Sequence, residues 1–225
     1  MDFYKLMKSL DALIYEVLTW LLLYPMTLYW MLRHPVRTMA AAERDVTADP
    51  EHQFVDMLGP PLFLAITIGL IHLVELSTHN VMPDDMTGAL ADFLADDTNN
   101  IAFNILMFAL LPMITAIVAL RRRKAAVTSR TLRGPVYAHC YSAAVVAIIF
   151  SASSLVGNVT MPAGDTIASA LLVIGALWWG WVTARWFHRE EELARMKALG
   201  ATATALFLWG VAVLVVLILL VIATV

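Results

Sequence analysis

Two ionisable side chains, His72 and Glu75, lie inside a stretch that is otherwise apolar enough to cross a membrane. Residues three apart on a helix share a face, so the imidazole and the carboxyl are expected side by side. Such a pair can hydrogen bond, carry a proton or attract a cation. Ionisable groups at membrane depth are costly, and they usually face the protein interior or a water-filled cavity.

Other polar residues are expected at the same depth, because neighbouring apolar stretches begin or end there. We therefore predict an outward-facing polar vestibule formed by His72, Glu75, Asn104, Ser151, Ser154 and Asp165. Two alternatives stay open. The polar groups can serve only as hydrogen bonds between helices. A metal site is the other alternative, although His-x-x-Glu supplies only two ligands.

A second polar set is predicted at the inner leaflet, formed by His139, Tyr141 and Arg185. A histidine in this position is otherwise explained as a hydrogen-bonding partner between packed helices. The nearby aromatic cluster "WWGW" (178–181) is typical of interfacial belting or packing. A platform for a lipid or a quinone is its alternative.

The composition indicates that these sites sit in a multi-pass membrane protein. The chain has 225 residues, of which 60% are hydrophobic and 15% charged, whereas about a quarter of the residues in a soluble domain are charged. Mean hydropathy is +0.75. A spanning helix needs about 20 mainly apolar residues. Five stretches meet that length within the predicted transmembrane domain 57–225: about 57–77, 100–120, 136–156, 166–187 and 201–224.

The basic residues indicate how these stretches are oriented. All 15 Lys and Arg residues lie in the N-terminal segment, between 33 and 56, within 121–135, or between 185 and 197. The connections 78–99 and 157–165 contain none of them and hold six Asp residues instead. Because Lys and Arg favour the cytoplasmic side, we predict a cytoplasmic N-terminus and an external C-terminus in an inner (cytoplasmic) membrane.

The apolar segment 14–32 does not fit that topology as a span, because it would place Lys5 and Lys8 outside. It also contains Glu16 and Pro25. We predict that residues 1–56 form an interfacial or re-entrant helical hairpin bent at Pro25, followed by a cytoplasmic linker. The predicted fold class is thus all-α: a bundle of five transmembrane helices with an N-terminal hairpin.

Three shorter helical features are expected in the connections. We predict a helix over 36–44, an external helix around 86–95, and a helical extension of the fourth span over 188–200 that ends at Gly200.

Part of the chain resembles a known group of membrane proteins. The element "HPVRTM" (34–39) before an apolar span that opens with proline is similar to the entry of Yip1-like bacterial membrane proteins and a neighbouring uncharacterised family. The segments "ALLPMITAIVALRRRK" and "VYAHCYSAAVVAIIF" resemble their proline-containing span, basic loop and His-bearing span. Where that family usually has Glu before the histidine, this chain has Ala138. The resemblance implies about five spans and a permease label that rests on fold alone.

The sequence favours a small oligomeric permease or channel, whose vestibule would favour cations. A non-catalytic scaffold or accessory subunit of a larger membrane complex is the alternative, and an intramembrane enzyme ranks last because catalytic motifs are missing. We expect no cofactor, metal or nucleic acid. The expected partners are lipids, another membrane protein or a second copy. Anionic lipids are expected at the tract Arg121, Arg122, Arg123 and Lys124.

Overall fold

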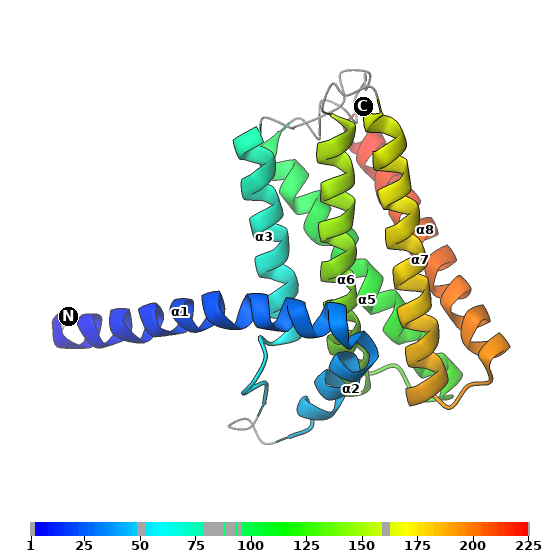
Figure 1. Cartoon of the computed structure of the whole chain (residues 1–225), viewed down its shortest axis with the longest axis horizontal. Helices are drawn as coiled ribbons and strands as arrows, with labels where there is room; N and C mark the ends of the chain where they lie inside the picture. Colours follow the sequence, from blue (N-terminus) through cyan, green and yellow to red (C-terminus); the bar gives the residue numbers. More distant parts are fainter. Residues whose placement is uncertain are drawn as a thin grey trace.

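The computed structural model describes residues 3–48, 53–78, 88, 93, 96–158 and 163–224, and every regular element within them is an α-helix (Figure 1). The external helix predicted around 86–95 lies outside the described residues, apart from two single positions. The helices are α1 (Phe3–Arg33), α2 (Pro35–Asp45), α3 (Pro60–Thr78), α5 (Asp97–Arg122), α6 (Ser129–Gly157), α7 (Gly164–Glu190) and α8 (Arg195–Thr224).

The long helices fall into two orientations (Figure 1). Helices α3, α5, α6, α7 and α8 run alongside one another, whereas α1 lies across them near the end where α2 packs. Among the described residues, six helices are long and apolar enough to cross a membrane: these same long helices together with α1. The five stretches predicted as spans are therefore all helices, and α1 is a sixth apolar helix that stands apart in its direction.

Helix α1 differs from the predicted hairpin. It continues through Pro25 without ending, and the chain turns instead at His34. Pro35 is the physical reason: a residue before proline is pushed out of the helical region, and His34 has φ −138° and ψ 56°. The hydroxyl of Thr38 donates to the carbonyl oxygen of Trp30 at 3.2 Å and so satisfies one end of α1. The short helix predicted over 36–44 is confirmed as α2.

Helix α6 is the centre of the bundle and packs against α2, α3, α5 and α7. Its buried face carries small residues, of which Ala143, Ala144 and Ala147 are completely buried. Small side chains let helix backbones approach closely, which is how membrane helices gain packing contacts. At Gly175 of α7, an added Cβ would lie 2.8 Å from the Cγ2 of Ile149. The α6–α7 contact therefore has no room for a side chain there.

Hydrogen bonds between elements join α1 and the start of α3 to this core. The amide of Leu58 donates to the hydroxyl of Thr27 at 2.9 Å, and its carbonyl accepts from the hydroxyl of Tyr141 at 2.6 Å. The hydroxyls of Tyr24 and Thr67 lie 3.1 Å apart. Only the C-terminal half of α1 makes such contacts. Residues 7–18 of α1 are exposed, so this half of the helix has no partner in the bundle.

The end of α7 also differs from the prediction. The helical extension over 188–200 is wrong, because α7 ends at Glu190 and α8 begins at Arg195. Between them Glu192 adopts a positive φ of 52°. The chain therefore reverses direction ten residues earlier than Gly200 suggested, and this places the bases of α7 opposite those of α8.

Candidate functional site

The predicted outer cluster is only partly assembled. The side chain of Ser151 lies close to the carboxyl of Glu75, which also lies within electrostatic reach of His72. Glu75 Oε2 and His72 Nδ1 are buried and have no hydrogen-bond partner within the described part of the chain. Helices α3 and α6 thus meet through a polar contact, and two polar atoms beside it are left unsatisfied.

The other residues predicted for this cluster lie elsewhere. Asn104 donates its amide to Asn100 of its own helix at 2.9 Å. Ser154 and Asp165 are exposed. None of the contacts among the described residues links these three side chains to Glu75 or His72.

The predicted inner-leaflet set is not one site. His139 and Tyr141 are two residues apart on α6 and point to different sides of it. The His139 ring lies edge-on to Trp186 of α7, with ring centroids 4.7 Å apart, and neither of its nitrogens has a protein partner in the described chain. Tyr141 faces Leu58 and Phe63 instead. Arg185 is exposed on the outer side of α7, over the ring of Trp181.

The bases of the tract at the end of α5 differ in whether they have an ion-pair partner. Arg123 is engaged: its Nε lies 2.6 and 2.7 Å from the carboxylate oxygens of Glu191, and its Nη2 lies 3.0 Å from Glu43. The bonds to Glu191 hold the pKa of Arg123 above its ordinary value. Burial raises the pKa of the Glu43 carboxyl, and the charge of Arg123 opposes that rise.

Arg123 therefore ties three segments together: α2, the end of α5 and the connection between α7 and α8. The Glu191 side chain is only 3% exposed. By contrast Arg121, Arg122 and Lys124 are exposed and have no ion-pair partner among the described residues. Lipid binding at these three stays a prediction, whereas Arg123 has a structural partner.

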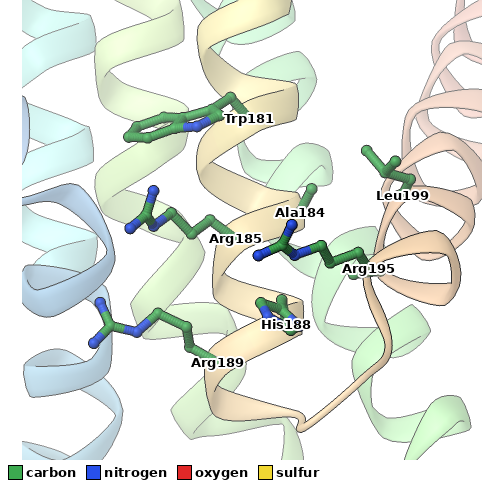
Figure 2. A pocket seen from close by; sticks show the side chains of 8 residues that line it. Trp181, Ala184, Arg185, His188, Arg189, Arg195 and Leu199 are labelled. Carbon is green, nitrogen blue, oxygen red and sulfur yellow. The ribbon is translucent and has the colours of Figure 1, made fainter.

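The structure adds a basic cleft that the sequence did not predict (Figure 2). It has a volume of about 590 Å³ and lies between the last turns of α7 and the first turn of α8. Figure 2 shows Arg195 reaching from α8 toward α7, above His188. The lining residues are Trp181, Ala184, Arg185, His188, Arg189, Arg195, Ala198 and Leu199.

The charges in this cleft are all of one sign. None of the described residues that line it is acidic, and Arg185, Arg189 and Arg195 form no hydrogen bond or ion pair with a described side chain. The guanidinium of Arg185 lies 5.5 Å from the ring centroid of Trp181. His188 Nδ1 lies 2.6 Å from the carbonyl oxygen of Leu193, which it reaches as a donor. That bond holds the imidazole at the floor of the turn.

Such an arrangement attracts an anion. Guanidinium groups present planar donors that match phosphate or carboxylate oxygens in pairs. The start of α8 adds backbone amides and the positive end of its dipole. Arg185 was predicted as a site residue, but Arg189 and Arg195 were missed because a continuous helix over 188–200 would have separated them.

Metal binding has no visible basis in the part of the chain that the structure describes, where no group of three His, Cys, Asp or Glu side chains could hold an ion.

The helices define the class as an α-helical membrane protein. No family model, curated protein or solved structure matches the chain. The resemblance to Yip1-like proteins therefore stays a prediction.

Proposed function

We propose that α3, α5, α6, α7 and α8 cross the membrane, with the α2 end in the cytoplasm and α1 along the inner surface. Three observations support this topology. The bases of α2, of the α5–α6 connection and of the α7–α8 connection gather at one end of the bundle (Figure 1). Helix α1 crosses the bundle at that end. Basic residues favour the cytoplasmic side of a membrane.

The function that the geometry supports best is binding of an anionic lipid headgroup in the α7–α8 cleft. The observation that carries it is the presence of three unpaired guanidinium groups, from Arg185, Arg189 and Arg195, in one cleft. In the proposed topology this cleft opens at the inner leaflet. A phosphate there would offset the mutual repulsion of the three charges and accept several charge-assisted hydrogen bonds.

A lipid fits better than a free anion because an apolar surface adjoins the cleft. Val173, Ile174, Leu177 and Trp181 follow one exposed side of α7, and Leu177 is 68% exposed. Positions 174, 177 and 181 are spaced three and four apart, so they share a face. The phosphate would occupy the cleft while an acyl chain lies along this stripe.

The packed middle of the bundle supports an accessory or scaffold role over a standing pore. The small residues Ala143, Ala144 and Ala147 on α6 are fully buried between neighbouring helices. We place the protein in that non-catalytic class, as a subunit whose inner end holds an anionic lipid.

The test is lipid retention. The protein would be reconstituted in nanodiscs that contain equal amounts of phosphatidylglycerol and phosphatidylcholine. The lipids that it retains on release from the nanodiscs would be counted by native mass spectrometry. Arg185→Gln with Arg195→Gln should lower phosphatidylglycerol retention about tenfold, since a charge-assisted hydrogen bond contributes about 1.5–3 kcal/mol. The control pair is Arg44→Gln with Arg122→Gln, both exposed bases outside the cleft. An equal loss in the control pair would mean a diffuse basic surface and not a site.

A small permease is the second candidate, and the Glu75–Ser151 contact beside His72 favours it. Two unsatisfied buried polar atoms at this point are unusual for packing alone. The polar set would then be part of an outward-facing entrance that opens during transport.

A further inference from the structure

A second pocket lies at the corner of α1 and α2, apart from the α7–α8 cleft. Its volume is about 470 Å³, which is in the usual range for small-molecule sites. It is lined by Met26, Trp30, His34, Arg37, Thr38, Ala41, Asp56 and Met57. Three of these, His34, Arg37 and Thr38, belong to the "HPVRTM" element that the sequence analysis singled out.

The corner that carries the pocket is firmly fixed. Thr38 donates its hydroxyl to the carbonyl oxygens of both Trp30 and His34, at 3.2 and 3.0 Å. The His34 ring stacks on the Trp30 ring with centroids 5.8 Å apart. Pro35 begins α2 in the position where its missing amide is not needed. The positions of Trp30, His34 and Thr38 at the pocket are therefore set by the turn itself.

The pocket carries opposite charges that are not paired with each other. Arg37 and Asp56 both line it, and neither forms an ion pair or a side-chain hydrogen bond with another described residue. This distinguishes it from the α7–α8 cleft, whose charged groups are all basic. A ligand with one anionic and one cationic group would satisfy both residues.

Each side chain has a natural counterpart in a phosphate ester that bears an amine. Arg37 offers a planar pair of donors to phosphate oxygens. The carboxylate of Asp56 can accept from an ammonium group, and the face of the Trp30 ring adds attraction for the same cation.

An apolar surface next to the pocket indicates where such a ligand comes from. Met26 lines the pocket, and Leu22 and Tyr29 lie on the same side of α1, four residues before it and three after it. Their side chains are 73% and 58% exposed. A free phosphoamine would leave this surface uncovered, whereas the acyl chains of a lipid would cover it.

We propose that the pocket between α1 and α2 binds the headgroup of a zwitterionic phospholipid, with Arg37 on the phosphate and Asp56 and Trp30 on the amine. The lipid holds α1 against the base of the bundle, because its headgroup contacts α1, α2 and the segment before α3 together. This site is independent of the α7–α8 cleft.

The test uses binding of two short-chain lipids to the purified full-length protein in detergent, dihexanoyl phosphatidylethanolamine and dihexanoyl phosphatidic acid, measured by isothermal calorimetry. In a protein that carries Arg185→Gln and Arg195→Gln, where phosphatidic acid cannot bind in the α7–α8 cleft, the α1–α2 pocket should prefer the ethanolamine lipid, and the variants below are made in this background. Asp56→Asn should reduce that preference about tenfold, since it removes the partner of the amine. Arg37→Gln should weaken both lipids. Arg33→Gln and Asp11→Asn, exposed charges on α1 outside the pocket, should change neither.

Three outcomes would overturn the proposal. The first is equal affinity for the two lipids in the Arg185→Gln, Arg195→Gln background. The second is an Asp56→Asn variant that keeps the preference. The third is phosphoethanolamine without acyl chains binding as tightly as the lipid, which would mean a soluble ligand. Arg185→Gln with Arg195→Gln should leave ethanolamine-lipid binding intact, so failure here is distinguishable from failure of the α7–α8 site. Thermal unfolding of each variant without lipid checks that it is folded.

Discussion

The hydroxyl of Tyr141, in the middle of the bundle, donates to the carbonyl oxygen of Leu58 at 2.6 Å, across 83 positions of the chain. The same Leu58 donates its amide to Thr27 of α1 at 2.9 Å. One residue before α3 thus connects the crossing helix to the central helix α6. Tyr141 and Leu58 are both buried, so water cannot replace the Tyr141 hydroxyl as the donor to the Leu58 carbonyl oxygen.

Removing that hydroxyl should destabilise the protein. Tyr141→Phe leaves a buried carbonyl oxygen without this donor, and we expect a loss of about 1–3 kcal/mol in the free energy of unfolding. Thermal unfolding in one detergent can be followed with a thiol-reactive dye, since the single Cys140 is buried and reacts only on unfolding. The control is Tyr137→Phe, a half-buried tyrosine whose hydroxyl has no partner in the described chain. Equal effects of the two changes would contradict the role of the bond.

Arg123 offers a second stability test. Arg123→Gln strands the buried carboxylate of Glu191 and releases Glu43. We expect a loss of about 1–3 kcal/mol, less than for a fully buried pair because the Arg123 side chain is 34% exposed. Arg122→Gln is the matched control, since it removes the charge of a neighbouring arginine that is exposed and unpaired. The variant should also weaken phosphatidylglycerol retention, because Glu191 positions the connection between α7 and α8.

The pKa of Glu43 gives a pH-dependent prediction. Its folded pKa is raised above the ordinary 4.5, chiefly by burial, so the folded state holds a proton more readily than the unfolded chain. This contribution favours folding below the ordinary pKa and is lost as the pH rises through the raised value. Glu43→Gln lacks it. The stability of wild type relative to Glu43→Gln should therefore fall as the pH rises from 4.5 through the raised pKa, as measured by thermal unfolding. A difference that rises over this range would show that Arg123 outweighs the burial.

The proposed topology predicts which lysines are accessible. Lys5 and Lys8 should not react with an impermeant amine reagent added to intact cells, while they should react once the cells are opened. A periplasm-active reporter fused at Val225 should be active, and one inserted at Thr128 inactive. Labelling of Lys5 and Lys8 from outside would make α1 a sixth span. Pro25→Ala should not change the labelling, because α1 is already continuous through Pro25.

The sequence predicted the positions of the helices better than the shape of the N-terminal segment. The long apolar stretches predicted the helices well, because a membrane helix must satisfy its backbone internally and so shows itself by length and hydropathy. The predicted hairpin bent at Pro25 is not confirmed, since two prolines were candidates for the turning point. Helix α1 continues through Pro25, whereas Pro35 begins a new helix.

The sites were harder to predict than the helices. Depth in the membrane can be estimated from the sequence, and it predicted Glu75 and Ser151 at one level, where the structure has them close together. The direction in which a side chain points depends on helix rotation, which hydropathy alone does not fix. Asn104 turned to Asn100 on its own helix, and Arg123 found partners 80 and 68 residues away. Pairings over such distances leave no local pattern to detect.

A substitution of the buried His139 on α6 tests whether this residue serves helix packing or binds a ligand. Neither nitrogen of His139 has a protein partner in the described chain, so His139→Phe strands no protein group. The ring would keep its edge-on contact with Trp186, and we expect the free energy of unfolding to stay the same or rise by about 1 kcal/mol. A loss of more than about 2 kcal/mol would contradict this interpretation of His139 as a packing residue. Dye-monitored unfolding measures the change.

The last prediction concerns Glu75 and His72, on which the permease candidate depends. If the pair lines an aqueous entrance, a cysteine placed at either position, in a Cys140→Ser background, should react rapidly with an impermeant thiol reagent added outside. Cation flux into proteoliposomes should fall in Glu75→Gln, because that change keeps the shape and removes the charge. Ser154, exposed on α6, provides a positive control position for labelling. Labelling at 154 without labelling at 72 or 75, together with flux unaffected by Glu75→Gln, would leave the pair as a contact between helices and remove the main support for transport.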